Sequence, residues 1–473
     1  MLRLAVAVVA IAGIAGVASP SGARASQPLR TAIMDPTTFE GPQAELAFAR
    51  TKAAGASAVR LVLRWSRVAP VEPDGDARDP ADPAYDWSSF DAQVEAAVGA
   101  GLDPIVCITH APLWARDVAA GGAGTTWPKT GALADFAAAA ALRYATLAVR
   151  TWQVWNEPNA RSHLNPQYRG GRPATPGHYR AMVNAFAEAV HAVNPNNVVV
   201  AGALAPFGHL ARDIQVVAPL RFMRAMLCVS RAGAATCSAR AQFDVWAQNP
   251  YTNGGPDRQA SARDDVSIGD LPEVRRVLAQ ANRVRHVTAR DPVELWVTEF
   301  SWDTQPPDPH GVAASLHARW IAEALYAMWQ SGVTLVTWWR LRDDPLTTPY
   351  QSGLYARRGT NLDLDHAKPS LAAFRFPFVA RPTRHGVLVW GRLPPGSAGR
   401  VEIERRVGRT WRPVVRIAPD RYGIFRAVLP TPASGSVRAR LPGVVSSLPF
   451  SLARPPAKRV HPFGCGGSIS CRP

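Results

Sequence analysis

The sequence almost lacks long apolar runs. One such run, residues 4–17, follows Arg3 and precedes Ala23-Arg24-Ala25, which has the A-x-A pattern of a cleavage site. The run is shorter than the roughly 20 residues that a membrane span needs. We therefore expect residues 1–25 to be a signal peptide cleaved after Ala25 and the mature chain to be secreted; a retained anchor is the alternative. No later segment is apolar enough to span a membrane.

Cysteine is scarce, with five residues in 473. An exported protein can form disulfides, and two pairs are close enough in sequence to close small loops: Cys228 with Cys237, and Cys465 with Cys471. Cys107 lies in an apolar run and is expected to be a buried free thiol. No group of cysteines and histidines has the spacing of a zinc site, so we expect neither a metal nor a cofactor.

Acidic residues are also few: 36, against 53 lysines and arginines, which gives a formal charge of +17. Nearly all of the excess, +14, lies in residues 381–473. The arginines are spread along alternating segments, which is typical of an arginine-favouring genome; adhesion to an acidic cell-surface polymer is the functional alternative. Nucleic acid is not an expected partner, because no binding motif accompanies the charge.

Short apolar runs alternate with helix-like runs between residues 29 and 379. Eight strand candidates occur, at residues 31–34, 58–63, 103–109, 151–155, 198–204, 243–248, 294–298 and 333–338. Eight strand-then-helix units predict an α/β fold with parallel strands, and their number and length favour a closed (β/α)8 TIM barrel.

The pattern changes after residue 379. Short alternating runs separated by Pro-Pro-Gly, Pro-Asp and Ser-Gly breaks predict a small antiparallel β-sandwich over residues 380–453. Residues 454–473 are expected to form an irregular tail.

Two glutamates follow apolar, aromatic-rich strand candidates. Glu157 comes after residues 151–155, the fourth strand, and Glu299 ends the seventh. The carboxyl ends of barrel strands share one mouth, so the two side chains are expected to face each other across it. Two facing carboxyl groups are the requirement for glycoside hydrolysis, which predicts an enzyme acting on glycosides or oligo- and polysaccharides.

The motifs Asn156-Glu157-Pro158 and Glu299-Phe300-Ser301-Trp302 resemble those of the clan A retaining glycoside hydrolases, particularly of families 39 and 5. The resemblance covers the barrel. It implies that Glu157 is the acid/base and Glu299 the nucleophile in a double displacement on β-linked substrates. It further implies that Asn156 holds the sugar 2-hydroxyl, that Arg60 lies near the nucleophile and that Tyr251 orients it.

Further contacts are implied with less support from the motifs. Many relatives have His-Pro-Tyr where this chain has Asn249-Pro250-Tyr251, which leaves one substrate contact open. His110, Trp338 and Trp339 end strands and are expected to contact sugar, as is Trp302 in the loop after Glu299. The alternatives are a core position for His110, a position of Trp302 away from the substrate, and Arg64 in place of Arg60.

Two rival functions stay open. The barrel could be a catalytically inactive carbohydrate-binding or wall-associated protein, or a transglycosylase that passes the glycosyl group to a sugar.

Overall fold

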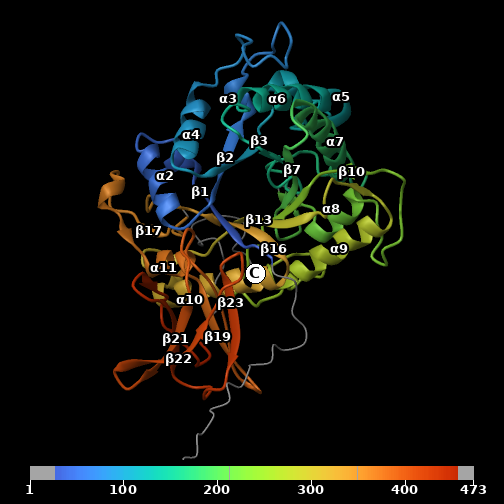
Figure 1. The fold of residues 1–473 in the computed structure, drawn as a ribbon. Helices are drawn as coiled ribbons and strands as arrows, with labels where there is room; N and C mark the ends of the chain where they lie inside the picture. The colour runs from blue at the N-terminus through green and yellow to red at the C-terminus, as the bar shows by residue number, and fades with distance from the viewer. Residues whose placement is uncertain (1–26, 212–213, 349, 456–473) are drawn as a thin grey trace, which may run out of the picture.

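The structure is a computed structural model that describes residues 27–211, 214–348 and 350–455. Eight parallel strands close into a barrel, as predicted (Figure 1). In chain order they are β1 (Arg30–Met34), β2 (Ala58–Arg64), β3 (Asp103–Thr109), β4 (Thr151–Val154), β7 (Val198–Leu204), β11 (Val245–Gln248), β13 (Glu294–Phe300) and β16 (Val333–Trp339).

Helices surround the barrel, as the alternation of strand and helix-like runs predicts (Figure 1). They are α2 (Ala44–Ala53), α4 (Ser88–Gly99), α6 (Thr130–Arg143), α7 (Thr175–Val193), α8 (Pro219–Met226), α9 (Leu271–Arg283), α10 (Ala314–Gln330) and α11 (Pro369–Arg375), with the short α1 (Pro36–Phe39), α3 (Trp65–Val68) and α5 (Val118–Gly121). Gly55, Gly101 and Gly332 follow α2, α4 and α10 with positive φ, a conformation in which glycine commonly ends a helix.

Short strands lie in the loops between these elements. They are β5 (Tyr168–Arg169), β6 (Arg172–Pro173), β8 (His209–Ala211), β9 (Ile214–Val216), β10 (Ala241–Gln242), β12 (Val287–Thr288), β14 (Thr304–Gln305), β15 (Val312–Ala313), β17 (Tyr355–Ala356) and β18 (His366–Ala367). The sequence pattern did not indicate them.

The inside of the barrel is filled by alternate residues of its strands. Ala32, Ala58, Val200, Ala247 and Leu335 belong to one small cluster of buried apolar side chains there. Because side chains alternate along a strand, the neighbouring residues point outward to the helices. Apolar side chains fill the interior, so the barrel is a packed core, and polar chemistry is confined to the mouth.

The C-terminal part forms two antiparallel sheets, at the bottom of Figure 1. One contains β19 (Phe378–Thr383), β20 (Gly386–Arg392) and β23 (Ile424–Leu429); the other contains β21 (Val401–Val407), β22 (Thr410–Ile417), β24 (Ser436–Leu441), β25 (Val445–Ser446) and β26 (Phe450–Ser451). Strand β19 was not predicted. Trp390 of β20 packs its ring against Tyr326 and Trp329 of α10, which joins the sheets to the barrel.

A buried cation strengthens this junction. The Arg392 side chain is almost fully enclosed, and its guanidinium donates to the carbonyl oxygen of Leu29 at 2.8 Å and to Thr31 Oγ1 at 3.2 Å. Both acceptors belong to the start of the barrel, so the C-terminal sheets are bonded to the amino end of β1.

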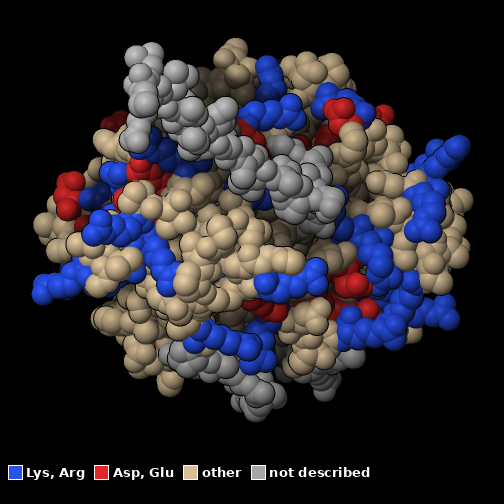
Figure 2. Space-filling model, turned by 60° about the horizontal axis from the view of Figure 1, so that its bottom comes forward, with Lys and Arg blue, Asp and Glu red and all other residues tan. Residues whose placement is uncertain are grey.

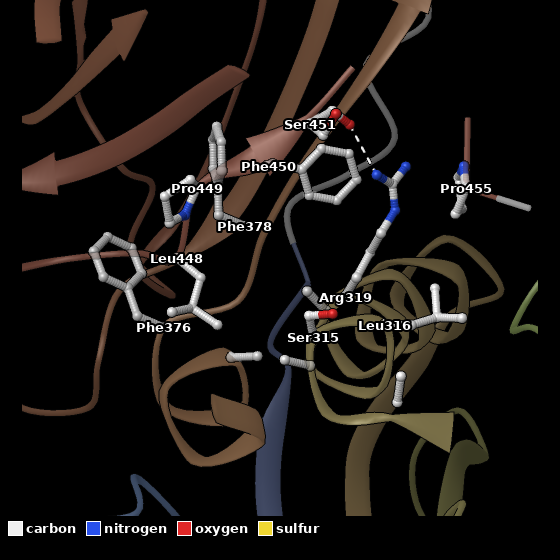
Figure 3. A pocket seen from close by; sticks show the side chains of 14 residues that line it. Ser315, Leu316, Arg319, Phe376, Phe378, Leu448, Pro449, Phe450, Ser451 and Pro455 are labelled. Carbon is white, nitrogen blue, oxygen red and sulfur yellow. Dashed lines mark hydrogen bonds between the residues drawn. The ribbon is translucent and has the colours of Figure 1, made fainter. Parts of the chain in front are cut away.

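An apolar cavity of about 660 Å³ lies between α10, α11 and the C-terminal strands (Figure 3). Leu316 comes from α10, Phe376 and Phe378 from the segment after α11, and Leu448 and Phe450 from the last strand region. None of the residues predicted for the functional site lines it. The cavity therefore belongs to the junction of helices and sheets, apart from the barrel mouth.

The basic residues of the C-terminal part are partly neutralised within their own sheet. Glu402 pairs with Arg416 and Arg440, and Glu404 pairs with Arg438 and Arg440. Figure 2 shows lysine and arginine side chains in separate groups with uncharged surface between them. The basic side chains on the face shown are therefore not gathered in one patch.

The cysteines fall into three groups. Cys228 and Cys237 form the predicted disulfide, with 5.2 Å between their Cα atoms. Cys107 is a buried free thiol, as predicted. Cys465 and Cys471, and the expected signal peptide, lie outside the described residues. Across the described ranges, no helix is long and apolar enough to cross a membrane.

Candidate active site

The two predicted glutamates stand at the ends of β4 and β13. Glu299 is the last residue but one of β13, and Glu157 follows β4 by a short turn. Trp155 and Glu157 have φ of 65° and 44°, in the left-handed region that costs a non-glycine residue about 1–2 kcal/mol. Hydrogen bonds hold this turn: the Glu157 N–H donates to the Ala203 carbonyl at 3.0 Å. Backbone strain of this kind is concentrated at functional sites in proteins.

Both carboxylate oxygens of Glu299 have a donor. The guanidinium Nη1 of Arg60 lies 3.2 Å from Oε2, and the phenolic hydroxyl of Tyr251 donates to Oε1 at 2.8 Å. Arg60 also donates to Gln153 Oε1 at 2.9 Å and to Asn156 Oδ1 at 2.8 Å. The fully buried Arg60 thus fixes the nucleophile candidate and the asparagine beside the acid/base candidate in one network.

Arg64, the alternative to Arg60, lies elsewhere. Its side chain is 41% exposed, and its guanidinium is 3.9 Å from Glu40. Strand β2 places Arg60 and Arg64 on the same face, but only Arg60 is deep enough to meet Glu299. The structure therefore brings together Arg60, Asn156, Glu157, Tyr251 and Glu299.

Neutral side chains surround Glu157. The amide Nδ2 of Asn249 donates to Oε1 at 3.2 Å, and Asn249 is itself oriented by a hydrogen bond from Thr298 Oγ1 at 2.9 Å. His163 Nε2 lies 3.5 Å from the other oxygen, Oε2. Asn249, at the position where this chain departs from the family motif, therefore contacts the acid/base candidate directly.

Because their partners differ, the two carboxyl groups differ in their tendency to hold a proton. Burial raises the pKa of Glu157, and the opposing influences are the Asn249 amide and the Arg60 charge. Burial and repulsion from Glu157 raise the pKa of Glu299, and Arg60 and Tyr251 oppose the rise. Two like charges in one buried site resist joint ionisation. The proton is best held on Glu157, since Glu299 alone contacts a guanidinium.

Both glutamates raise the pKa values of two nearby tyrosines. Burial, Glu299 and Glu157 raise the pKa of Tyr350 to about 12. The pKa of Tyr251 is also raised by burial, with contributions from Glu299 and Glu157. Arg60 contacts both Glu299 and Asn156, the residue before Glu157, so the two glutamates lie at the same end of the barrel.

The predicted aromatic contacts fall into two classes. Trp302 and Trp338 are fully buried, and their indole N–H groups donate to the carbonyls of Thr252 and Ser352 at 3.0 Å. These two pack the barrel wall, which differs from the sugar contact expected of them: in alternation along β16, Trp338 faces α10 and Trp339 faces inward. Trp339 is only partly buried and packs on Tyr350 with ring centroids 5.6 Å apart.

His110 is exposed at the end of β3, and its Nδ1 lies 2.8 Å from Thr109 Oγ1. An exposed side chain excludes the core position considered for it. Partial desolvation of the imidazole at the mouth, reinforced by the charges of Arg64 and His163, lowers the pKa of His110. His110 follows β3, which pairs with β4, the strand that precedes Glu157.

Buried ion pairs hold the loop after β16, residues 340–368. Arg340 contacts Asp35 and Asp344, Arg342 lies 2.7 Å from Asp365, and Lys368 lies 2.5 Å from Asp343. All of these cationic and carboxylate side chains are nearly inaccessible to solvent. They fix the segment that carries Tyr350 against Trp339.

The sequence did not single out His163, Tyr350, Gln153 or Thr298. Gln153 and Thr298 could have been found, because each is a polar residue near the carboxyl end of an otherwise apolar strand. His163 and Tyr350 lie on loops, where spacing carries no directional signal.

Comparison with known protein families gives one match, which ends before Glu299. Residues 26–260 match the family described as cellulase (glycosyl hydrolase family 5), a span that includes Arg60, Asn156, Glu157 and Tyr251. No curated protein matches the chain in sequence.

Two solved structures show the same fold. A family 39 glycoside hydrolase from Bacteroides cellulosilyticus WH2 has 16% identity and a TM-score of 0.55, over 85% of this chain and 81% of its own. A monomeric beta-xylosidase from Caulobacter crescentus CB15 has 18% identity and a TM-score of 0.50, over 93% and 96%.

Proposed function

Since the chain is a glycosidase that resembles the clan A glycoside hydrolases, we propose that it is a secreted retaining enzyme that hydrolyses β-linked O-glycosides. Glu157 is the acid/base and Glu299 the nucleophile. The observation that carries the proposal is the difference between their partners: Glu299 contacts the Arg60 guanidinium, whereas Glu157 contacts the amide of Asn249 and the imidazole of His163.

The reaction has two displacement steps. In the first, the ionised Glu299 attacks the anomeric carbon as the glycosidic bond breaks, and the Glu157 proton passes to the leaving oxygen. In the second, Glu157, now a carboxylate, takes a proton from water, and the water oxygen displaces Glu299 from the anomeric carbon. Burial of Glu157 supports the first step by keeping its proton at a higher pH, and Arg60 supports the ionised nucleophile.

Substitution of the two glutamates tests the assignment. Glu299→Ala should abolish turnover of aryl β-glycosides, whereas Glu157→Ala should keep some turnover of an activated aryl glycoside, and added azide should increase it and yield a β-glycosyl azide. Glu294→Ala is the matched control: Glu294 begins the same strand and contacts Trp296 and Thr334, so activity should persist. Full activity of both site variants would refute the assignment.

The product's stereochemistry tests retention independently. Proton NMR during early turnover should show the β-anomer first, before mutarotation. Initial formation of the α-anomer would mean direct displacement by water. If the wild type binds glycans tightly but hydrolyses none, the inactive carbohydrate-binding barrel replaces the enzyme; if acceptor sugars collect the glycosyl group in preference to water, the enzyme is a transglycosylase.

Export is supported by the Cys228–Cys237 disulfide, since such bonds persist mainly in oxidising compartments. We propose cleavage after Ala25. Amino-terminal sequencing of the protein recovered from the culture medium should begin at Ser26. Recovery only from the membrane fraction with the first residues intact would contradict it.

The basic C-terminal part is proposed to adhere to an acidic cell-surface polymer. The support is the surplus of arginine after residue 380, reduced by the pairs that Glu402 and Glu404 make. Retention on an anionic polysaccharide resin should decrease with salt. A charge-reducing variant at the exposed Arg406, Arg409 and Arg412 should elute earlier than the wild type, and equal elution would contradict adhesion through this region.

A further inference from the structure

His163 lies on the turn that carries Glu157. Its backbone N–H donates to the Ala160 carbonyl at 3.0 Å, and its own carbonyl accepts from Trp155 Nε1 at 3.0 Å. Trp155 directly precedes the Asn156-Glu157 pair, so the imidazole and the carboxyl group are held by one short loop. Nε2 of His163 lies 3.5 Å from Glu157 Oε2, with both side chains partly exposed to the mouth.

Four charged or titratable groups face this imidazole. Glu157 is the nearest, Glu299 and Arg60 act on it from β13 and β2, and His110 faces it from the end of β3. Burial lowers the pKa of His163, with Glu299 opposing and Arg60 reinforcing the change. The lowered pKa favours the neutral form of the imidazole. A neutral imidazole can present an N–H to a carboxylate.

We propose that His163 is a positioning residue for the acid/base, which holds Glu157 Oε2 and stabilises the carboxylate left when the proton has moved to the leaving oxygen. The proposal rests on the function proposed above. Asn249 holds the opposite oxygen, Oε1, so the two donors together would fix the plane of the carboxyl group. With its proton on Nε2, the imidazole lies at a distance that closes to a hydrogen bond by a small side-chain shift.

This role affects mainly the first displacement, in which Glu157 gives its proton to the leaving group. Acid catalysis is needed when the leaving group is a weakly acidic phenol or an alkoxide, and hardly at all when it is dinitrophenolate. Loss of a donor to the Glu157 carboxylate weakens it as an acid and raises its pKa. A positioning defect therefore grows as the leaving group becomes poorer, whereas general damage to the barrel lowers turnover of all substrates alike.

The test compares His163→Leu with His163→Gln in the full-length protein. The glutamine amide can occupy the place of Nε2, and leucine offers no polar atom. Steady-state kinetics use phenyl and 2,4-dinitrophenyl β-glycosides of the sugar that the wild type hydrolyses. For His163→Leu we expect kcat/KM to fall by at least about tenfold more on the phenyl than on the dinitrophenyl substrate, a part of the 10²–10⁴ that general acid catalysis contributes. The alkaline limb of its pH profile should move upward, and His163→Gln should recover most of the loss.

A second histidine–carboxylate pair provides the control. His191 Nε2 lies 3.2 Å from Asp244 Oδ2, at the opposite end of β11 from the mouth, so His191→Gln should leave the leaving-group dependence unchanged. An equal fall of His163→Leu on both substrates, or no fall, would overturn the inference while the proposed function stands. A wild type inactive on every glycoside would overturn both. Turnover of the dinitrophenyl substrate shows that the variant is folded.

Discussion

The phenolic oxygen of Tyr251 lies 2.8 Å from Oε1 of Glu299, on the opposite oxygen from the one that Arg60 contacts. Tyr251 comes from the segment after β11 and Arg60 from the middle of β2, so two distant strands hold one carboxylate. The nucleophile is oriented before any substrate arrives, which reduces the reorganisation needed in the transition state.

Tyr251→Phe should therefore weaken catalysis without unfolding the protein. A hydrogen bond to a charged group contributes about 1.5–3 kcal/mol, which corresponds to a decrease in kcat/KM of roughly 10- to 100-fold. The pKa of Glu299 should rise further in this variant, so the acidic limb of the pH profile should move upward. Unchanged kinetics at all pH values would show that the hydroxyl does not orient the nucleophile.

The wild-type pH dependence should be bell-shaped. Activity needs an ionised Glu299 and a protonated Glu157, and burial raises the pKa of Glu157. Activity should accordingly be lost on the alkaline side only above the ordinary range of a glutamate, and the two limbs describe the coupled pair. Glu157→Gln, assayed on a dinitrophenyl glycoside, should lose the alkaline limb. Persistence of that limb would assign it to another group.

Arg392→Met should destabilise the whole protein and spare the chemistry. Burial lowers the pKa of Arg392 to about 10, so the side chain is still protonated at neutral pH, and it serves the Leu29 carbonyl and Thr31. Loss of these donors leaves buried acceptors unpaired, at a cost of about 1–3 kcal/mol. Denaturant titration measures this decrease in the free energy of unfolding. Arg416→Met removes a mostly exposed side chain and leaves Glu402 paired with Arg440, so it should cost less than about 1 kcal/mol.

The Cys228–Cys237 disulfide should contribute to stability in the same measurement. It closes a loop with a sequence separation of 9 residues, and restriction of the unfolded chain by so short a loop contributes about 2–3 kcal/mol. The double variant Cys228→Ser with Cys237→Ser should unfold at a lower denaturant concentration and keep its activity at low denaturant. An unchanged midpoint would mean that the bridge adds nothing.

The barrel could be predicted because its strands are buried on both faces and appear as compact apolar runs. Residues 103–109 and 198–204 were predicted with the bounds that β3 and β7 have. Glycine ends three helices and marks their limits. Strand β19 was not predicted, because its last residues, Pro382 and Thr383, interrupt the apolar pattern.

The site could be predicted in part, for a different physical reason. Strand ends converge in any parallel barrel, so Glu157 and Glu299 could be paired by topology alone. The packing of Trp302 could not, because this residue lies in the loop after β13, where strand alternation no longer gives a direction. His163 and Tyr350 depend on loop conformations that spacing does not encode.

The ion pairs of residues 340–368 restrict how the mouth can change. Each of Arg340, Arg342 and Lys368 neutralises a carboxylate that has almost no contact with water, so replacement of one partner strands the other charge in the interior. Single charged substitutions within residues 340–368 are therefore a poor route to new substrate preferences. Replacing the whole segment, or altering loops on the other side of the mouth, is an easier route.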